Sequence, residues 1–263
     1  MLETSLSQPA WVIGVAVAIN DITVMQWSIL ACSALIIGVA KTGLPGIGIT
    51  AIPLVAMVIP ARESTGLILP MLIVGDIFAV CFYHRHAVWS HLLRLIPFSI
   101  TGIVIGFYAM KVIPSQYFGP LIGGTILLML GLNYWRTRKG DNVPVPEGWW
   151  FPVCMGLVGG ITTMMANAAG PVMVIFLLAM RLPKTEFIGT GAWFFLVVNC
   201  LKVPFSTGLG LINPDSLKFN LILLPLIVIG ALAGVRLAKK VPEKIFNTLV
   251  QVLAAAMAVK LLF

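Results

Sequence analysis

Apolar and polar stretches alternate along the chain in a pattern that occurs twice. Two sets of five apolar segments lie on either side of a polar stretch at residues 136–148. The segments cover about 26–40, 46–59, 65–83, 92–112 and 115–135 in the first set, and about 149–164, 168–181, 187–207, 217–238 and 243–263 in the second. A helix needs about 20 apolar residues to cross about 30 Å of hydrocarbon, so the last three segments of each set are long enough to span a membrane. The runs are continuous rather than alternating, which excludes a membrane β-barrel.

The first two segments of each set are shorter, at roughly 13–16 residues, or about 20–24 Å of helix. Segments of this length are more typical of re-entrant pieces than of full spans. We therefore expect an all-α polytopic membrane protein in which each half is a re-entrant or short helical hairpin followed by three transmembrane helices. Residues 1–24 hold an apolar piece at 9–20 that is too short to span, and this N-terminal segment is predicted to be interfacial. It contains no Lys or Arg, so no cleaved signal peptide is expected.

The two halves share residues at constant spacing, which indicates an internal duplication. Pro97, Gly102, Gly106, Lys111, Pro114 and Phe118 match Pro225, Gly230, Gly234, Lys239, Pro242 and Phe246 at an offset of 128. Upstream, Pro60, Glu63, Gly66 and Asp76 correspond to Pro183, Glu186, Gly189 and Asn199 at an offset of 123. The sequence therefore predicts a first transmembrane repeat at 25–135, a linker at 136–148 and a second transmembrane repeat at 149–263.

The distribution of Lys and Arg predicts how the halves are oriented. If each hairpin returns to the side on which it began, the halves are inverted, and eleven basic residues lie on one side against four on the other. The larger group is Arg85, Arg94, Arg136, Arg138, Lys139, Arg181, Lys184, Arg236, Lys239, Lys240 and Lys244, and the smaller is Arg62, Lys111, Lys218 and Lys260. A single crossing in place of each hairpin would make the halves parallel and the counts eight and seven. The positive-inside rule favours inverted-topology repeats in a bacterial inner membrane, with the linker cytoplasmic and the C-terminus periplasmic.

Composition narrows the class of protein further. Hydrophobic residues make up 59% of the chain, charged residues 10%, and the mean hydropathy is +1.03, so a soluble domain could not shield this apolar surface from water. The net charge of +8 comes from basic residues scattered over short loops, which excludes nucleic-acid binding. The four cysteines are far apart within apolar segments and are expected to be buried packing residues.

Candidate chemistry lies where the hairpins break. The first break, Lys41–Pro53, is rich in glycine and contains Pro45, which forces a helix to end or restart. The helix that follows would direct its free N–H groups and positive dipole end toward the tip, where they suit an anion, and Lys41 adds a full positive charge. The second break, Thr162–Pro171, has hydroxyl and amide groups in place of the lysine. Inverted repeats with broken helices are typical of secondary transporters, whose sites lie near the membrane midplane.

The predicted anion-binding residues come from both hairpin tips and from one later helix. They are Lys41, Thr42, Gly43, Pro45, Gly46, Gly48, Thr163, Asn167, Ala168, Gly170 and Lys202. The alternative is that the glycines only allow close helix packing and that Lys41 extends to a membrane interface. Lys202 is open to the same choice between an anion contact and an interfacial position.

Asp76 and its counterpart Asn199 are the candidate coupling residues. Asp76 lies near the middle of a predicted span, where a carboxylate is costly and therefore a candidate functional group. It could carry a proton, or it could stay ionised by accepting hydrogen bonds or by pairing with Lys41. Asn199 offers similar hydrogen bonds but cannot titrate.

The first break and the duplication together resemble the TauE/SafE family of sulfite and organosulfonate exporters. The resemblance rests on the run Lys41–Gly48, on Pro53 and the weaker second break before Pro171, and on the duplicated organisation over about 25–263. Pro45 interrupts the consecutive glycines that are commoner in the family. The resemblance implies a secondary transporter that exports small sulfur-containing anions such as sulfite or organosulfonates.

Other functions are weighed against this one. An anion channel would use similar chemistry without coupling to pH or voltage gradients. An integral-membrane enzyme would need a nucleophile–base pair or a metal cluster within the spans; the histidines lie in a basic loop around residues 84–91, and we expect no enzyme, no metal site and no cofactor. A permease subunit of a larger complex is compatible with the sequence, although the chain has no P-loop. The expected partners are a small anion, the lipid bilayer, protons and a second copy of the chain in a homodimer.

Overall fold

The structure, a computed structural model, describes residues 22–43, 47–117, 148–180 and 182–240, with the isolated positions 120, 121, 124, 127, 128 and 131. These residues form eight α-helices and no strand. The helices are α1 (Val24–Thr42), α2 (Gly48–Ala56), α3 (Ala61–Tyr83), α4 (Trp89–Val112), α6 (Trp150–Ala166), α7 (Ala169–Ala179), α8 (Lys184–Gly208) and α9 (Pro214–Lys240), with two 3-10 turns, η2 (His84–His86) and η3 (Ser115–Tyr117). The predictions for the N-terminal segment, for the linker and for the last segment of the second half fall almost entirely outside the described residues, and the last segment of the first half is described only at 115–117 and at the isolated positions.

Five helices, α1, α3, α4, α8 and α9, are long and apolar enough to cross a membrane. This finding confirms the predicted all-α polytopic membrane fold. Helix α1 is longer than predicted, because a capping box between Thr23 and Gln26 starts it early and it continues through Thr42, for 19 residues. Its partner α2 has only 9 residues, or about 13 Å of helix. The first hairpin therefore has one arm of spanning length and one short arm.

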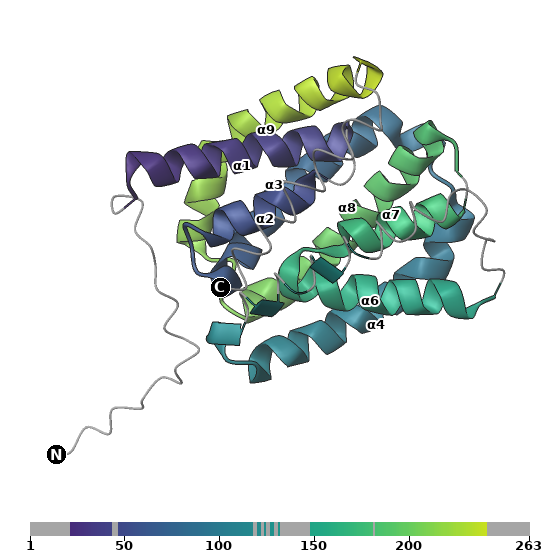
Figure 1. The fold of residues 1–263 in the computed structure, drawn as a ribbon, viewed down its shortest axis with the longest axis horizontal. Helices are drawn as coiled ribbons and strands as arrows, with labels where there is room; N and C mark the ends of the chain where they lie inside the picture. Colours follow the sequence, from purple (N-terminus) through teal and green to yellow (C-terminus); the bar gives the residue numbers. More distant parts are fainter. Residues whose placement is uncertain are drawn as a thin grey trace.

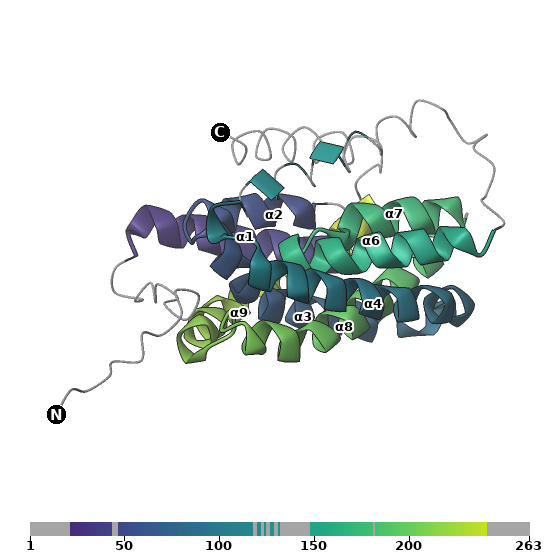
Figure 2. The ribbon, with the colours of Figure 1, turned by 90° about the horizontal axis from the view of Figure 1, so that it is seen from below.

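The described helices form two layers (Figures 1 and 2). In one layer α9, α3, α8 and α4 lie side by side in that order, and in the other α1, α2, α7 and α6 do. The most extensive contacts join the layers, with α1 along α9 and α4 along α6. Each of these pairs joins the first helix of one half to the last described helix of the other. This reciprocal pairing, in which each half lends its first helix to the last described helix of the other, is what a pseudo-twofold relation between the halves requires. The inverted orientation of the halves in a membrane stays a prediction.

Glycines at equivalent positions allow these close contacts. A Cβ atom at Gly102 would collide with the backbone of α6, and one at Gly230 would collide with the backbone of α1. Small residues therefore allow the close contacts between these helices. The helix starts also correspond, because Pro60 precedes α3 with φ −48° and Pro183 precedes α8 with φ −55°, and the proline ring holds φ in this range.

The two hairpins enter the bundle from opposite ends (Figure 1). Helix α1 begins where α9 begins, since the rings of Trp27 and Phe219 have centroids 5.5 Å apart. Helix α6 begins at the other end and α7 returns toward it, because Phe176 of α7 stacks on Phe151 near the start of α6 with centroids 5.7 Å apart. The second hairpin therefore ends at the side of the bundle from which it started.

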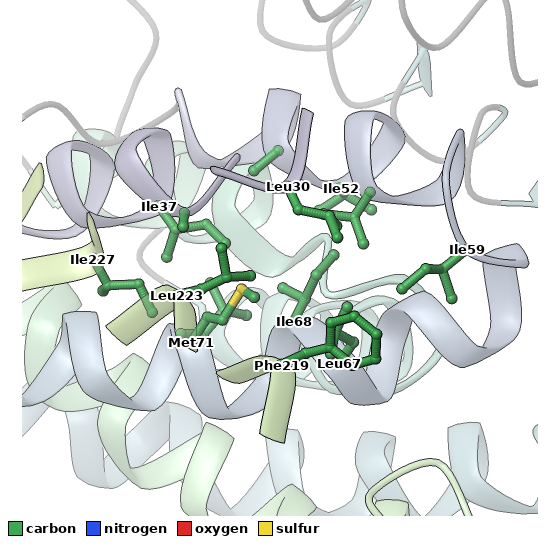
Figure 3. Close-up of a cluster of buried hydrophobic side chains, with 14 of the residues drawn as sticks. Leu30, Ile37, Ile52, Ile59, Leu67, Ile68, Met71, Phe219, Leu223 and Ile227 are labelled. Atoms are coloured by element: carbon green, nitrogen blue, oxygen red, sulfur yellow. The ribbon is translucent and has the colours of Figure 1, made fainter. Parts of the chain in front are cut away.

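An apolar cluster joins the two halves (Figure 3). Leu30 and Ile37 of α1 pack with Ile68 of α3 and with Leu223 and Ile227 of α9. A second cluster fills the space between α4, α6, α7 and α8. Because lipid tails are as apolar as leucine, close packing rather than escape from water holds such clusters together within a membrane.

The cysteine prediction is wrong. Cys32, Cys81, Cys154 and Cys200 are all exposed on the outside of the helices. An apolar neighbourhood in the sequence indicates the interior of a soluble protein, but in a membrane protein it also describes the surface that faces lipid.

Candidate functional site

A cavity of about 90 Å³ lies between the two hairpins and the central helices α3 and α8. Its polar and charged side chains are Lys41, Asp76, Thr163, Asn167 and Asn199. Gly48 and Gly170, in the first turns of α2 and α7, lie at its wall. The cavity has room for a few water molecules or one small anion.

Lys41 reaches the cavity from the last turn of α1, where a positive charge also suits the helix dipole. Its Nζ lies 2.7 Å from Asp76 Oδ1 and 4.2 Å from the ring centroid of Phe195, close enough for a cation–π contact. Gly75 makes room for the Lys41 stem, because a Cβ at that position would collide with it. A carboxylate and an aromatic face therefore hold the ammonium inside the bundle.

Asp76 and Asn199 meet where α3 packs on α8. Each is the sixteenth residue of its helix, and Asn199 Nδ2 donates to Asp76 Oδ2 over 2.7 Å. Two residues that the repeat relates by 123 positions thus bond to each other directly. One oxygen of the buried Asp76 carboxylate faces Lys41 and the other accepts from Asn199. Of the two roles considered for Asp76, these contacts favour the carboxylate that stays ionised.

Lys202 lies one turn beyond Asn199 and is only 1% exposed. Its ammonium donates to Asn167 Oδ1 over 2.6 Å, to Thr163 Oγ1 over 3.1 Å and to Asn199 Oδ1 over 3.4 Å. The interfacial position considered for Lys202 is therefore wrong, because these bonds hold it in the interior. Its three partners line the cavity and Lys202 does not, so the ammonium lies directly behind the cavity wall.

Asn167 forms the tip of the second hairpin. It ends α6 with a left-handed backbone, φ 52° and ψ 23°, which Asn tolerates better than most residues. Its Nδ2 donates to the carbonyl oxygen of Thr65 over 2.9 Å, while its Oδ1 accepts from Lys202. Side-chain bonds thus attach this tip to both α3 and α8.

The first turns of α2 and α7 bring backbone N–H groups to the cavity. The first amides of a helix have no acceptor within it, and together with the helix dipole they suit an anion. At the first hairpin the nearest is Gly48, which lines the cavity. At the second, the amide of Ala168 already donates to the carbonyl of Thr162 over 3.2 Å. The donors left at this tip are therefore those of Ala169 and Gly170 rather than Ala168.

Two predicted site residues lie on the opposite side of α1. Thr42 is fully buried, and its Oγ1 donates over 2.6 Å to a carbonyl oxygen of α9. Gly43 caps α1 and approaches the backbone of α9 at Gly234. Both residues serve the contact between α1 and α9 and neither lines the cavity. Pro45 and Gly46 lie outside the described residues.

The apolar part of the lining was not predicted. It includes Ile49, Ile52, Leu72, Leu177, Phe187 and Phe195. Within a continuous apolar segment, nothing distinguishes a residue that faces a cavity from one that faces lipid. Phe195 is the residue that the sequence could have indicated, because it precedes Asn199 by four residues and therefore lies on the same helix face.

A bundle of apolar helices, with two broken hairpins around a small cavity that holds a few polar and charged side chains, has the architecture of a membrane transport protein. The family model described as "Sulfite exporter TauE/SafE" matches residues 30–261. The chain belongs to this family.

A curated relative supports the same class. The "Probable inner membrane transporter protein TsaS" of Comamonas testosteroni is 29% identical over 182 residues, which cover 67% of this chain and 73% of the relative. No solved structure matches the chain. With the apolar helices, the family assignment identifies a multi-pass membrane transporter and not an enzyme.

Proposed function

We propose that this chain is a secondary transporter that exports small sulfur-containing anions such as sulfite or organosulfonates. The anion would bind between the two hairpin tips, near the membrane midplane. The observation that carries the proposal is the cavity itself, which has Lys41 in its wall, Lys202 directly behind it and a single carboxylate, Asp76, among its lining residues. Two lysines to one carboxylate, within a low-dielectric surrounding, suit an anion.

Each part of the cavity would contact a different part of the anion. The Lys41 ammonium and the first amides of α2 and α7 would hold the charged oxygens, because charge-assisted hydrogen bonds are the stronger ones. Thr163 and Asn167 would add polar contacts from the second tip. Leu72 and Phe195 would face the carbon end of an organosulfonate. The family assignment and the name of the relative support transport, and the chemistry of the cavity supports an anion.

Transport would depend on the fact that the two hairpins enter the bundle from opposite ends. If the halves are inverted in the membrane, with the linker cytoplasmic and the C-terminus periplasmic, rocking of one half against the other would open the cavity to each side in turn. Near neutral pH sulfite exists partly as a monoanion, and a transporter that exchanges or co-transports a proton with it would make the anion flux depend on the pH gradient. Proton coupling is therefore part of the proposal.

An anion channel is the second candidate, since the same cationic cavity would serve it. Flux into proteoliposomes, measured with sulfite, thiosulfate, taurine and chloride, tests both candidates. A transporter gives saturable flux of the sulfur anions that responds to an imposed pH gradient and is low for chloride. Fast, non-saturating flux of chloride and of the sulfur anions alike, with no response to pH, contradicts the transporter in favour of the channel.

A further inference from the structure

Lys202 combines two features that the proposed anion contacts do not use. It is almost completely buried, and its three hydrogen-bond partners are the neutral oxygens of Thr163, Asn167 and Asn199. Lys41, by contrast, has the Asp76 carboxylate at 2.7 Å. The two lysines of the site therefore differ in how their charges are compensated.

An ammonium without a carboxylate partner is costly inside a membrane protein. Asp76 cannot serve as that partner, because its oxygens face Lys41 and Asn199, and Asn199 stands between it and Lys202. An anion in the cavity would supply the missing negative charge, separated from Lys202 only by the side chains that line the cavity. The charged state of Lys202 is thus favoured when the cavity is occupied and disfavoured when it is empty.

We infer that Lys202 takes up a proton when an anion enters the cavity and releases it when the anion leaves. The inference rests on the proposed anion function. In its neutral form Lys202 would donate to the amide oxygens of Asn167 and Asn199 and accept from the Thr163 hydroxyl. The proton comes from water and binds the Nζ lone pair, so a monovalent anion and one proton enter together. With Lys41 and Asp76 as a compensated pair, the buried cluster is then neutral both empty and loaded.

Other groups around Lys202 do not replace it in this role. The charges that act on it are those of Lys41 from α1 and Asp76 from α3, and these two neutralise each other. Helices α2, α6 and α7 carry no Asp, Glu, Lys, Arg or His, and the ionisable residues of α4 lie near its two ends. Cys200, two positions away on α8, is exposed on the outside of the helix.

The experiment is calorimetry of methanesulfonate and thiosulfate binding to the purified full chain. Neither anion changes its charge across the pH range of the titration, and repeating it in buffers of different ionisation enthalpy counts the protons taken up. For the wild type we expect proton uptake that approaches about one per monovalent anion, and an affinity that falls about tenfold per pH unit on the alkaline side.

Two substitutions at Lys202 should abolish the link between anion binding and proton uptake, one by fixing the positive charge and the other by removing it. Lys202→Arg, which stays charged, should bind methanesulfonate without proton uptake and with a flat pH profile. Lys202→Gln should bind weakly and also without uptake. The matched control Lys41→Arg, which keeps the charge that compensates Asp76, should keep the uptake, with altered affinity. A merely structural Lys202 would change affinity or folding in both variants while proton uptake persisted.

Three outcomes would overturn the inference. Wild-type binding without proton uptake removes it but leaves the proposed anion function standing. Uptake that survives both Lys202 variants and disappears in Asp76→Asn assigns the proton to the carboxylate instead. If neither anion binds the wild type at any pH, the proposed function fails, and the inference fails with it.

Discussion

At the scale of single residues, the central feature is a chain of side chains that joins the two hairpin tips. It runs from Lys41 through Asp76 and Asn199 to Lys202 and ends at Asn167, with each contact 3.4 Å or shorter. Every link joins a donor to an oxygen acceptor. An incoming anion must therefore compete with Asp76 for Lys41. The chain of contacts then transmits the change at the first hairpin tip to the second.

Lys41→Ala tests the direct contact. A charged hydrogen bond contributes about 1.5–3 kcal/mol, so its loss should weaken anion binding by about tenfold or more. Calorimetry or competition binding in detergent measures the change. Lys111→Ala is the matched control, because Lys111 lies over the Phe107 ring at the end of α4 and is not a cavity residue. Unchanged affinity of Lys41→Ala for every anion tested would show that Lys41 only anchors α1.

Gly170→Ala tests the size of the cavity. Gly170 lines it, and a Cβ at this position meets nothing within 4 Å. The added methyl group should leave the fold intact while it occupies space that a substrate needs. We expect the affinity for a bulky sulfonate to fall more than the affinity for sulfite, and the melting temperature to stay the same. Equal losses for both anions would contradict this placement of Gly170.

The sequence predicted much of the polar site and little of its connections. Lys41, Asp76 and Asn199 could be identified from the sequence because charged and amide side chains stand out within apolar segments. The orientation of Thr42 toward α9 could not be read, because α1 has polar residues on two faces and only tertiary packing decides which one meets the cavity. The apolar lining left no signal for a related reason, since lipid and cavity select the same side chains.

At the scale of helices, the repeat was the most informative signal. Corresponding prolines start α3 and α8, and corresponding glycines hold α4 to α6 and α9 to α1. The length of α1 was underestimated, because Lys41 and Thr42 interrupt its apolar pattern while the helix itself continues to Thr42. The interruption marked the site rather than the end of the helix.

Gly230→Ala tests the close packing of the helix pairs that join the two halves, α1 with α9 and α4 with α6. A Cβ at Gly230 would meet the carbonyl oxygen of Leu35 on α1, and overpacking of this kind costs about 1–3 kcal/mol. We expect a lower melting temperature for the purified protein, and the same for Gly102→Ala, its counterpart between α4 and α6. Gly208→Ala is the control, because its Cβ would meet nothing within 4 Å. Equal melting temperatures for all three variants would mean that the helices do not pack this closely.

At the scale of the whole molecule, an anion that moves with a proton carries no net charge across the membrane. Flux of a monovalent sulfonate should then be insensitive to a potassium potential imposed with valinomycin, while a pH gradient with the acid side outside should drive it inward. Net export would follow the anion's own gradient. Flux that rises steeply with the imposed potential would show that the anion moves without its proton.

The orientation of the halves is the last property to test, and it rests on charge alone. With eleven basic residues against four, the inverted arrangement puts the linker in the cytoplasm and the C-terminus outside. Cysteine labelling tests both ends in a background that lacks the four native cysteines, whose exposure on the helices makes their removal tolerable. A cysteine in place of Asn142 should react with a membrane-impermeant reagent only after the cells are opened, and one added after Phe263 should react in intact cells. Labelling at position 142 from outside intact cells would contradict this orientation, and labelling of both positions from the same side of the membrane would contradict the inverted halves.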